Sequence, residues 1–186
     1  MEHYKKTFRF KNEHNLANTK LKIKNYFEFY NFQYEEQDEN NFIFFKKFSF
    51  LSGWKFNPLH WESQVNIQLT ENAITIKYVN EGNAHITPFA FNELFIRFFS
   101  NLQRYVSKSI DFKENNRILF KKAKQKVVFQ FLIVFVFMGL LYTVIHSFFG
   151  QSKIMYLAFM IACLLPLKLV NQYWQSKNDT KLIINL

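Results

Sequence analysis

The sequence predicts an α+β protein, in which a cytoplasmic antiparallel β-sheet domain of order β-α-β-β-β-β-α precedes a two-helix transmembrane hairpin. Three patterns support this prediction. Short runs that alternate between apolar and polar residues lie between residues 6 and 79, an amphipathic helical pattern follows Pro88, and two long apolar runs lie between residues 127 and 170. Alternation is typical of half-buried strands, whereas apolar residues three and four apart are typical of helices.

The first elements are a strand, a short helix and a hairpin. The run KTFRFK (6–11) alternates and predicts a strand, and Asn12 to Asn15 then offer caps for a helix. The apolar residues of this helix are Leu16, Leu21, Ile23 and Phe27. Two further runs, at 28–36 and 42–50, flank the turn-forming QDENN and predict a hairpin.

A second hairpin and a longer helix complete the domain. SQVNIQLT (63–70) and AITIKYV (73–79) alternate cleanly around a two-residue turn. Thr87 is a good N-cap and Pro88 suits the first helical position, so a helix is predicted to residue 108. We expect both helices on one face of the sheet. We expect a short helical or irregular connector at 109–116, with the polar run 111–116 as its flexible point; the alternative is one nearly continuous helix from 88 to 150.

Two apolar runs predict the membrane hairpin. Val127–Gly150 is 24 residues long without a charge, and Ile154–Val170 contains one charge, Lys168. About 20 apolar helical residues cross a hydrocarbon core of about 30 Å. The predicted parts are the cytoplasmic domain (1–110), a basic juxtamembrane connector (111–126), two spans (127–150 and 154–172) and a cytoplasmic tail (173–186).

Charge is unevenly distributed along the chain. Residues 1–112 hold 14 basic and 12 acidic residues, whereas 113–126 hold six basic residues and one acidic residue. Basic residues beside a span favour the cytoplasmic side, so both termini are predicted in the cytoplasm. The residues expected to contact anionic lipid are Arg117, Lys121, Lys122, Lys124 and Lys126. Nucleic acid is the alternative partner for this run, but binding it would require a basic stripe on the domain, which is nearly neutral.

Composition indicates where the protein resides. The chain is rich in Phe, Lys, Asn and Ile, which is typical of an AT-rich bacterial genome, and the predicted location is the bacterial inner membrane. The N-terminal MEHYKKTFRF has no apolar stretch typical of a signal peptide. Its single cysteine, Cys163, cannot form an intramolecular disulfide.

The segment 51–62 is the candidate ligand or partner site of the domain, through Trp54, His60 and Trp61. Long loops rich in such residues are often functional. Two alternatives stay open, because tryptophan also favours membrane interfaces and is usually well buried in cores. A small-molecule or lipid-processing enzyme would use this same segment together with the exposed face of the sheet.

Motifs for catalysis and metal binding are absent from the sequence. There is no G-x-S-x-G, P-loop, G-x-G-x-x-G or H-E-x-x-H pattern, and the five histidines have no metal-ligand spacing. We therefore predict no catalysis, no metal and no cofactor.

The spans carry small residues at helical spacing: Gly139, Thr143, Ser147 and Gly150 on the first, and Ala158 and Ala162 on the second. Small residues let helices approach closely in lipid. These faces are expected to pack within one hairpin, or alternatively to form homo-oligomers. In the second case Gln130, Thr143 and His146 would line a polar seam or pore.

The functional prediction is an integral membrane protein that anchors a cytoplasmic partner-binding or sensing domain to the inner membrane. The partners expected are membrane lipids and a protein. The alternative is an oligomerising membrane effector or pore whose cytoplasmic domain is a sensor.

Overall fold

The computed structural model describes residues 4–47, 58–80 and 88–150, together with the single residues Phe159, Val170 and Gln172. The chain divides into two compact units, and the division falls between Lys121 and Lys122. Each unit is described by itself below.

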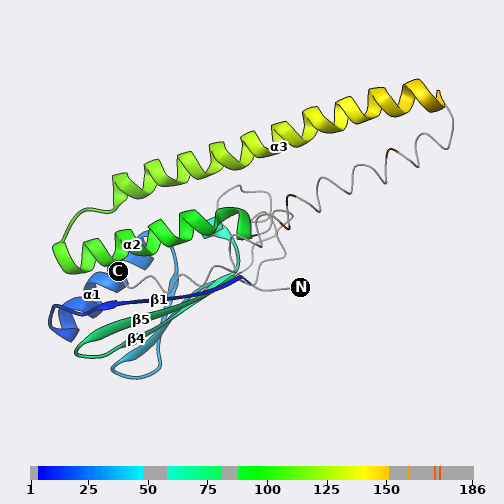
Figure 1. Ribbon diagram of the computed structural model, residues 1–186. Helices are drawn as coiled ribbons and strands as arrows, with labels where there is room; N and C mark the ends of the chain where they lie inside the picture. The colour runs from blue at the N-terminus through cyan, green and yellow to red at the C-terminus, as the bar shows by residue number, and fades with distance from the viewer. Residues whose placement is uncertain are drawn as a thin grey trace. The chain divides into compact units, whose positions relative to one another are not determined.

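The described residues of the first unit form a five-stranded antiparallel sheet with the order β1-β5-β4-β3-β2. Its strands are β1 (Tyr4–Lys11), β2 (Gln33–Glu36), β3 (Asn41–Lys46), β4 (Ser63–Leu69) and β5 (Ala73–Asn80). Helix α1 (Leu16–Phe29) joins β1 to β2, and helix α2 (Asn92–Lys108) follows β5. Both helices lie on the same side of the sheet (Figure 1). The predicted antiparallel α+β fold and its order of elements are therefore confirmed.

Several predicted elements differ from the structure in extent. The strand predicted at 42–50 is β3, which ends at Lys46. The helix α1 continues to Phe29, so β2 begins only at Gln33 and not at residue 28. Leu21 was predicted on the buried side of α1 but is 56% exposed, because the helical repeat places Ile23, Tyr26 and Phe27 toward the core instead. A 3-10 turn (η3, Pro88–Phe91) precedes α2, whose N-cap residue is Phe91; the predicted cap Thr87 lies outside the described residues.

Aromatic side chains fill the space between the helices and the sheet. The ring of Phe27 on α1 stacks on that of Phe44 on β3 at 4.6 Å, and Phe8 on β1 lies 4.3 Å from Phe99 on α2. All four side chains are at most 4% exposed. Burying one such side chain stabilises the fold by about 1.5–3 kcal/mol, so this layer supplies much of the domain's stability.

A long helix follows α2 after a four-residue link. Ser109 ends α2 in a left-handed conformation with φ of 55°, and α3 then runs without a break from Lys113 to Phe149. The predicted connector is thus shorter than expected, and the basic run is helical. The expected flexible point is also wrong in part, because Phe112 is 4% exposed and Asn116 is fully buried.

Asn116 is buried because its amide is completely hydrogen-bonded. Its Nδ2 donates to the hydroxyls of Tyr26 and Tyr30 at 2.9 and 2.8 Å, and its Oδ1 accepts from Asn101 Nδ2 at 2.7 Å. The Tyr26 hydroxyl in turn donates to the Phe98 carbonyl at 2.7 Å. We call this set of contacts the Asn116 junction; it attaches the first turns of α3 to α1 and α2.

The second predicted span lies outside the described residues, except for three positions. Phe159, Val170 and Gln172 are helical, and the Phe159 ring lies 5.3 Å from the ring of Tyr142 on α3. The tail 173–186 also lies outside the described residues. The two-helix hairpin therefore stays a prediction.

Candidate functional site

The sheet has a second face, which none of the described helices covers. Because successive side chains of a strand point to opposite faces, the residues that alternate with the buried ones along each strand project together on this side. We call it the open face. Its members are Lys5, Thr7, Arg9 and Lys11 on β1, Ala73, Thr75, Lys77 and Val79 on β5, Gln64, Asn66 and Gln68 on β4, Asn41, Ile43 and Phe45 on β3, and Gln33 and Glu35 on β2.

The strand register brings residues from distant parts of the sequence into rows across the open face. One row joins Arg9 to Thr75, Thr75 to Gln68, and Gln68 to Asn41. The neighbouring row contains Lys77 and Asn66. The middle of the open face is therefore built from amides and a hydroxyl, with cations toward the β1 edge.

The open face carries more positive than negative charge. Lys5, Arg9, Lys11 and Lys77 are all exposed, and none of them forms an ion pair with another described residue. Glu35 is the only acid among the sixteen members of the face.

The ion pairs of the described residues involve the helices instead. They are Lys20–Glu36, Lys24–Glu28, Glu93–Arg97 and Glu114–Arg117, with N–O distances between 2.7 and 3.8 Å. The charge of Lys20 is matched by Glu36. The hydrogen bond from Lys20 lowers the pKa of the Glu36 carboxyl and so favours its ionised form. The four cations of the open face have no such ion pair among the described residues.

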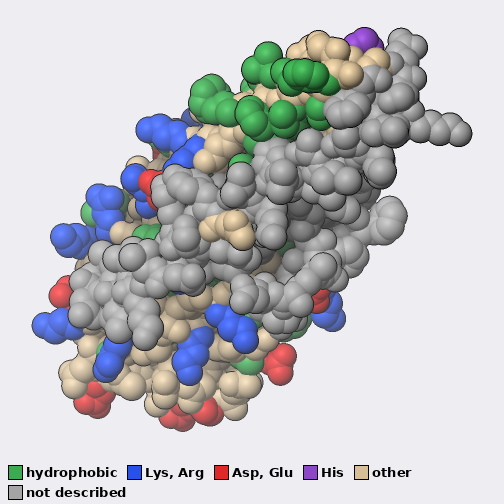
Figure 2. Space-filling view, turned by 45° about the vertical axis from the view of Figure 1, so that its right-hand side comes forward, with side chains coloured by type: hydrophobic (Ala, Val, Ile, Leu, Met, Phe, Trp, Pro, Cys, Tyr) green, Lys and Arg blue, Asp and Glu red, His purple; other side chains and the backbone are tan. Residues whose placement is uncertain are grey.

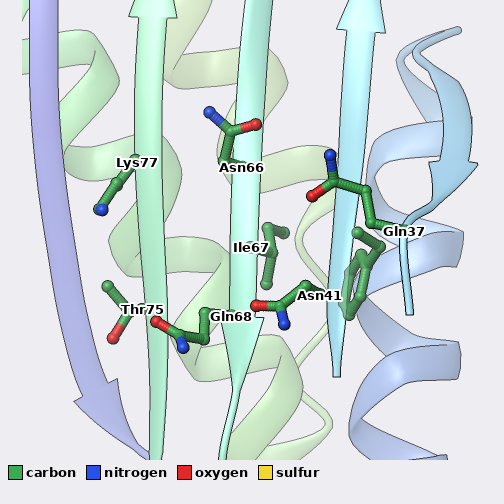
Figure 3. Close-up of a pocket in the computed structure, with 8 residues that line it drawn as sticks. Gln37, Asn41, Asn66, Ile67, Gln68, Thr75 and Lys77 are labelled. Carbon is green, nitrogen blue, oxygen red and sulfur yellow. The ribbon is translucent and has the colours of Figure 1, made fainter. Parts of the chain in front are cut away.

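A hollow of about 160 Å³ lies on the open face between β3, β4 and β5. Figure 3 shows Gln68 between Thr75 and Asn41 at this site, with Asn66 and Lys77 from the neighbouring row. Asn41 Nδ2 already donates to the Asp38 carboxylate at 2.9 Å. The side chains of Gln68, Thr75 and Lys77 make no hydrogen bond within the described part of the chain.

These groups are suited to binding polar and anionic partners. Amides donate and accept hydrogen bonds, and ammonium and guanidinium groups bind anions. Among the described residues, no three His, Cys, Asp or Glu side chains gather where they would hold a metal ion.

The residues predicted from the 51–62 segment occupy different environments. Trp54 lies outside the described residues. His60 is half-buried at the end of a 3-10 turn (η2, Pro58–His60). Trp61 is 2% exposed and meets the Phe91 ring edge-on at 5.4 Å, while its buried Nε1 has no hydrogen-bond partner among the described residues. Its position agrees with the alternative in which tryptophan covers the core, and a binding role for Trp54 and His60 stays a prediction.

Comparisons with protein-family models, with curated proteins and with solved structures find no match to this chain. The function must therefore be inferred from the residues of the chain themselves.

The second candidate site is the apolar part of α3. Among the described residues, α3 is the one helix long and apolar enough to cross a membrane, and only 6% of its most apolar window is buried. A helix in the core of a soluble protein would be mostly buried. Phe129, Phe135 and Phe148 are 63%, 65% and 81% exposed. Figure 2 shows a patch of exposed apolar side chains, drawn in green.

The basic residues predicted to contact lipid occupy the preceding turns of α3. Lys121, Lys122 and Lys126 are exposed, and Lys124 is half-buried. Arg117 is exposed and pairs with Glu114 at 2.8 Å, which raises the pKa of its guanidinium further. Cations therefore directly precede the apolar segment, as the sequence predicted, but their contact with lipid stays a prediction.

The small-residue face of α3 is exposed. Gly139, Thr143 and Ser147 are all exposed, and no described atom lies within 4 Å of a Cβ placed on Gly139. The Thr143 and Ser147 hydroxyls donate back to the carbonyls of Leu140 and Thr143, both at 2.8 Å. Gly150 ends the helix with φ of 58°, and Ala158 and Ala162 lie outside the described residues. The hydroxyls are thus satisfied within α3 and do not need water or a partner.

The less exposed side of α3 is not its small-residue face. Val127 and Val134 are 1% and 8% exposed, and Phe131, Met138, Leu141 and Ile145 continue this side at helical spacing as half-buried residues. The expected packing of Gly139 and Thr143 against a neighbouring helix therefore stays untested.

Proposed function

We propose that this protein is an integral membrane protein in which α3 anchors a cytoplasmic domain that binds a partner. The observation that carries the proposal is the exposed apolar length of α3, which directly follows a run of basic residues. Exposed apolar surface of this extent is unfavourable in water, and a bilayer would remove it from water. The open face supplies the binding surface of the domain.

We further propose a bacterial inner-membrane location, two spans and both termini in the cytoplasm. A second apolar run (154–170) and the contact between the Tyr142 and Phe159 rings support a helical return. The six basic residues of 113–126, set against the single Lys153 between the runs, support the orientation. The proposal includes no catalytic step, in line with the motifs that the sequence lacks.

Alkaline extraction tests membrane insertion. Membranes from bacterial cells expressing the full chain are washed with sodium carbonate, and we expect the protein in the pellet. Replacing Phe135, Val136 and Leu140 with Lys should move the protein into the soluble or aggregated fraction, because each charge at the middle of a span costs about 2.5–3.5 kcal/mol. Quantitative release of the unaltered chain would contradict the proposal.

Cysteine labelling tests the orientation. In a Cys163→Ser background, Ser152→Cys lies between the two apolar runs, whereas Glu71→Cys lies in the exposed turn between β4 and β5. A membrane-impermeant maleimide added to intact cells should label the Ser152→Cys variant only. Labelling of Glu71→Cys in intact cells, or of Ser152→Cys only after lysis, would overturn the orientation.

The alternative function is an oligomerising membrane effector or pore. The observation that favours it is the exposed small-residue face at Gly139, Thr143 and Ser147. Gly139→Leu should then lower the molecular mass measured in mild detergent, since a large side chain keeps helices apart. An unaltered chain that is monomeric in detergent and leaves the membrane potential unchanged would exclude this alternative.

A further inference from the structure

We propose that the open face binds an extended acidic polypeptide segment, whose carboxylates contact Arg9 and Lys77 and whose amides hydrogen-bond to Gln68 and Thr75. The inference rests on the proposed function, because it names the class of partner that the anchored domain would bind. It commits to a protein partner, and an anionic lipid surface is an outcome of the test below.

The charges of the open face support an anionic partner. Lys5, Arg9 and Lys11 project from β1, and Lys77 is the diagonal neighbour of Arg9 on β5. Their mutual repulsion is not offset by an ion pair within the described residues. A carboxylate placed between Arg9 and Lys77 would relieve this repulsion and gain charge-assisted hydrogen bonds.

The spacing of the cations supports an extended chain. Alternate residues of a strand are about 6.6–6.8 Å apart, so Arg9 and Lys11 present their charges at that interval. Alternate side chains of an extended peptide have the same interval. An acidic segment that lies over β1 and β5, parallel to the strands, can therefore match Arg9 and Lys11 without bending and reach Lys77 and Thr75 on β5.

Side chains that can form hydrogen bonds lie beside the cations and would orient a bound chain. Gln68 and Thr75 are neighbours across the β4–β5 ladder and lie at the hollow, and their side chains make no hydrogen bond to another described residue. Gln68 is exposed and Thr75 is half-buried, so both can reach a bound chain. Because an amide and a hydroxyl both donate and accept, they are suited to the peptide groups of a partner.

The composition of the open face favours a polypeptide over a lipid surface. Attraction to anionic lipid depends on the number of basic residues near the membrane, and amides add little to it. The open face combines cations with amides and with the half-buried apolar residues Ile43, Phe45 and Val79. Such a mixture is typical of protein–protein interfaces.

The test measures peptide binding to the full chain in non-ionic detergent. The probe is a fluorescent peptide of alternating Glu and Thr, as long as the eight residues of β1, and a Gln–Thr peptide is its uncharged control. Binding is followed by fluorescence anisotropy at low salt. We expect the unaltered chain to bind the Glu–Thr peptide and not the Gln–Thr peptide.

Three double variants separate the contributions. Arg9→Gln/Lys77→Gln should weaken binding about tenfold, or about 1.4 kcal/mol. Gln68→Leu/Thr75→Val should weaken it severalfold without changing the net charge. Arg104→Gln/Lys108→Gln removes the same two charges from exposed positions of α2, and it should change the affinity less than twofold. Unchanged circular dichroism melting curves serve as the control for folding.

Three results would overturn the inference. The first is equal loss of affinity in the two charge-removing variants, which would indicate non-specific attraction. The second is unchanged peptide binding in the Arg9/Lys77 variant; if this variant also loses binding to phosphatidylglycerol vesicles, the face is assigned to lipid. The third is an unaltered chain that does not discriminate between the Glu–Thr and Gln–Thr peptides. Carbonate extraction of the same variants reports on anchoring, so failure of the proposed function would be recognised separately.

Discussion

The two faces of the sheet use the same strands for different purposes. On β4, Val65, Ile67 and Leu69 are buried beneath the helices, while Gln64, Asn66 and Gln68 alternate with them on the open face. The covered face is aromatic, and its few polar groups are largely hydrogen-bonded to one another. The open face holds amides and unmatched cations. If stability resides on the covered face and the proposed binding on the open face, the two should respond separately to substitution.

The largest expected effect is a cavity in the covered face. Phe44→Ala should lower the free energy of unfolding by about 3–5 kcal/mol, because the ring is fully buried and stacked on Phe27. Urea unfolding of the full chain in detergent, followed by circular dichroism, measures the change. Its neighbour Ile43 lies on the open face, and Ile43→Ala should cost less than about 1 kcal/mol. Similar costs for the two would remove the distinction between the faces.

The Asn116 junction should be the next most sensitive position. Asn116→Leu leaves the buried Tyr26 hydroxyl without one hydrogen bond and the Asn101 amide without its acceptor, at a cost of about 1–3 kcal/mol. Asn115→Leu alters the adjacent exposed residue and is expected to change stability by less than about 0.5 kcal/mol. The same urea titration compares the two variants, and equal stabilities would show that the junction does not hold α3.

Alkaline pH should weaken the covered side of the domain. Burial raises the pKa of Tyr30 from 10.0 to about 12, and burial also raises the pKa values of Tyr26 and Tyr78. A group whose pKa is higher in the folded state contributes stability below its unfolded pKa and loses it as pH rises to the folded pKa. The urea midpoint should therefore fall between pH 10 and about 12. Tyr30→Phe should show a shallower fall over this interval, and an identical slope would contradict the assignment.

The smallest expected effect on stability belongs to the open face itself. Lys77→Gln and Gln68→Leu should each change the free energy of unfolding by less than about 0.5 kcal/mol, since both side chains are exposed and form no hydrogen bond or ion pair with another described residue. The measurement is again urea unfolding, now paired with peptide anisotropy. A loss of binding at unchanged stability would sharpen the comparison, whereas a loss of stability would show that the open face supports the fold.

Local patterns predicted most of the sheet. The alternation in 63–70 and 73–79 corresponds to β4 and β5 within one residue at their ends, because these strands are half-buried. The aromatic alternation near residue 28 misled the strand prediction, since Tyr26, Phe27 and Tyr30 can also cover one side of a helix. The order of the strands depends on pairing between distant segments, for which the sequence of one chain contains no local signal.

The candidate sites were harder to predict than the fold. Asn116 stands in a polar run that is typical of a connector, and its partners Tyr26 and Tyr30 are 90 and 86 residues away. The exposed face of the sheet was predicted as part of an enzyme site, but its residues were not named, because each of its polar residues is ordinary on the exposed side of a strand. Only the register places Arg9 beside Thr75 and Gln68. The amides on β4 and the cations on β1 were the signal available in advance.

The position of Asn116 in the chain has a consequence for biosynthesis. Domains generally fold as units during translation, in the order in which they leave the ribosome. Asn116 is synthesised after all the strands that the structure describes and after both helices that hold its partners, so α3 is the last of these described elements to join. The apolar segment follows immediately. We therefore expect the nascent chain to present its membrane segment for insertion only when a folded domain is ready to receive the first turns of α3.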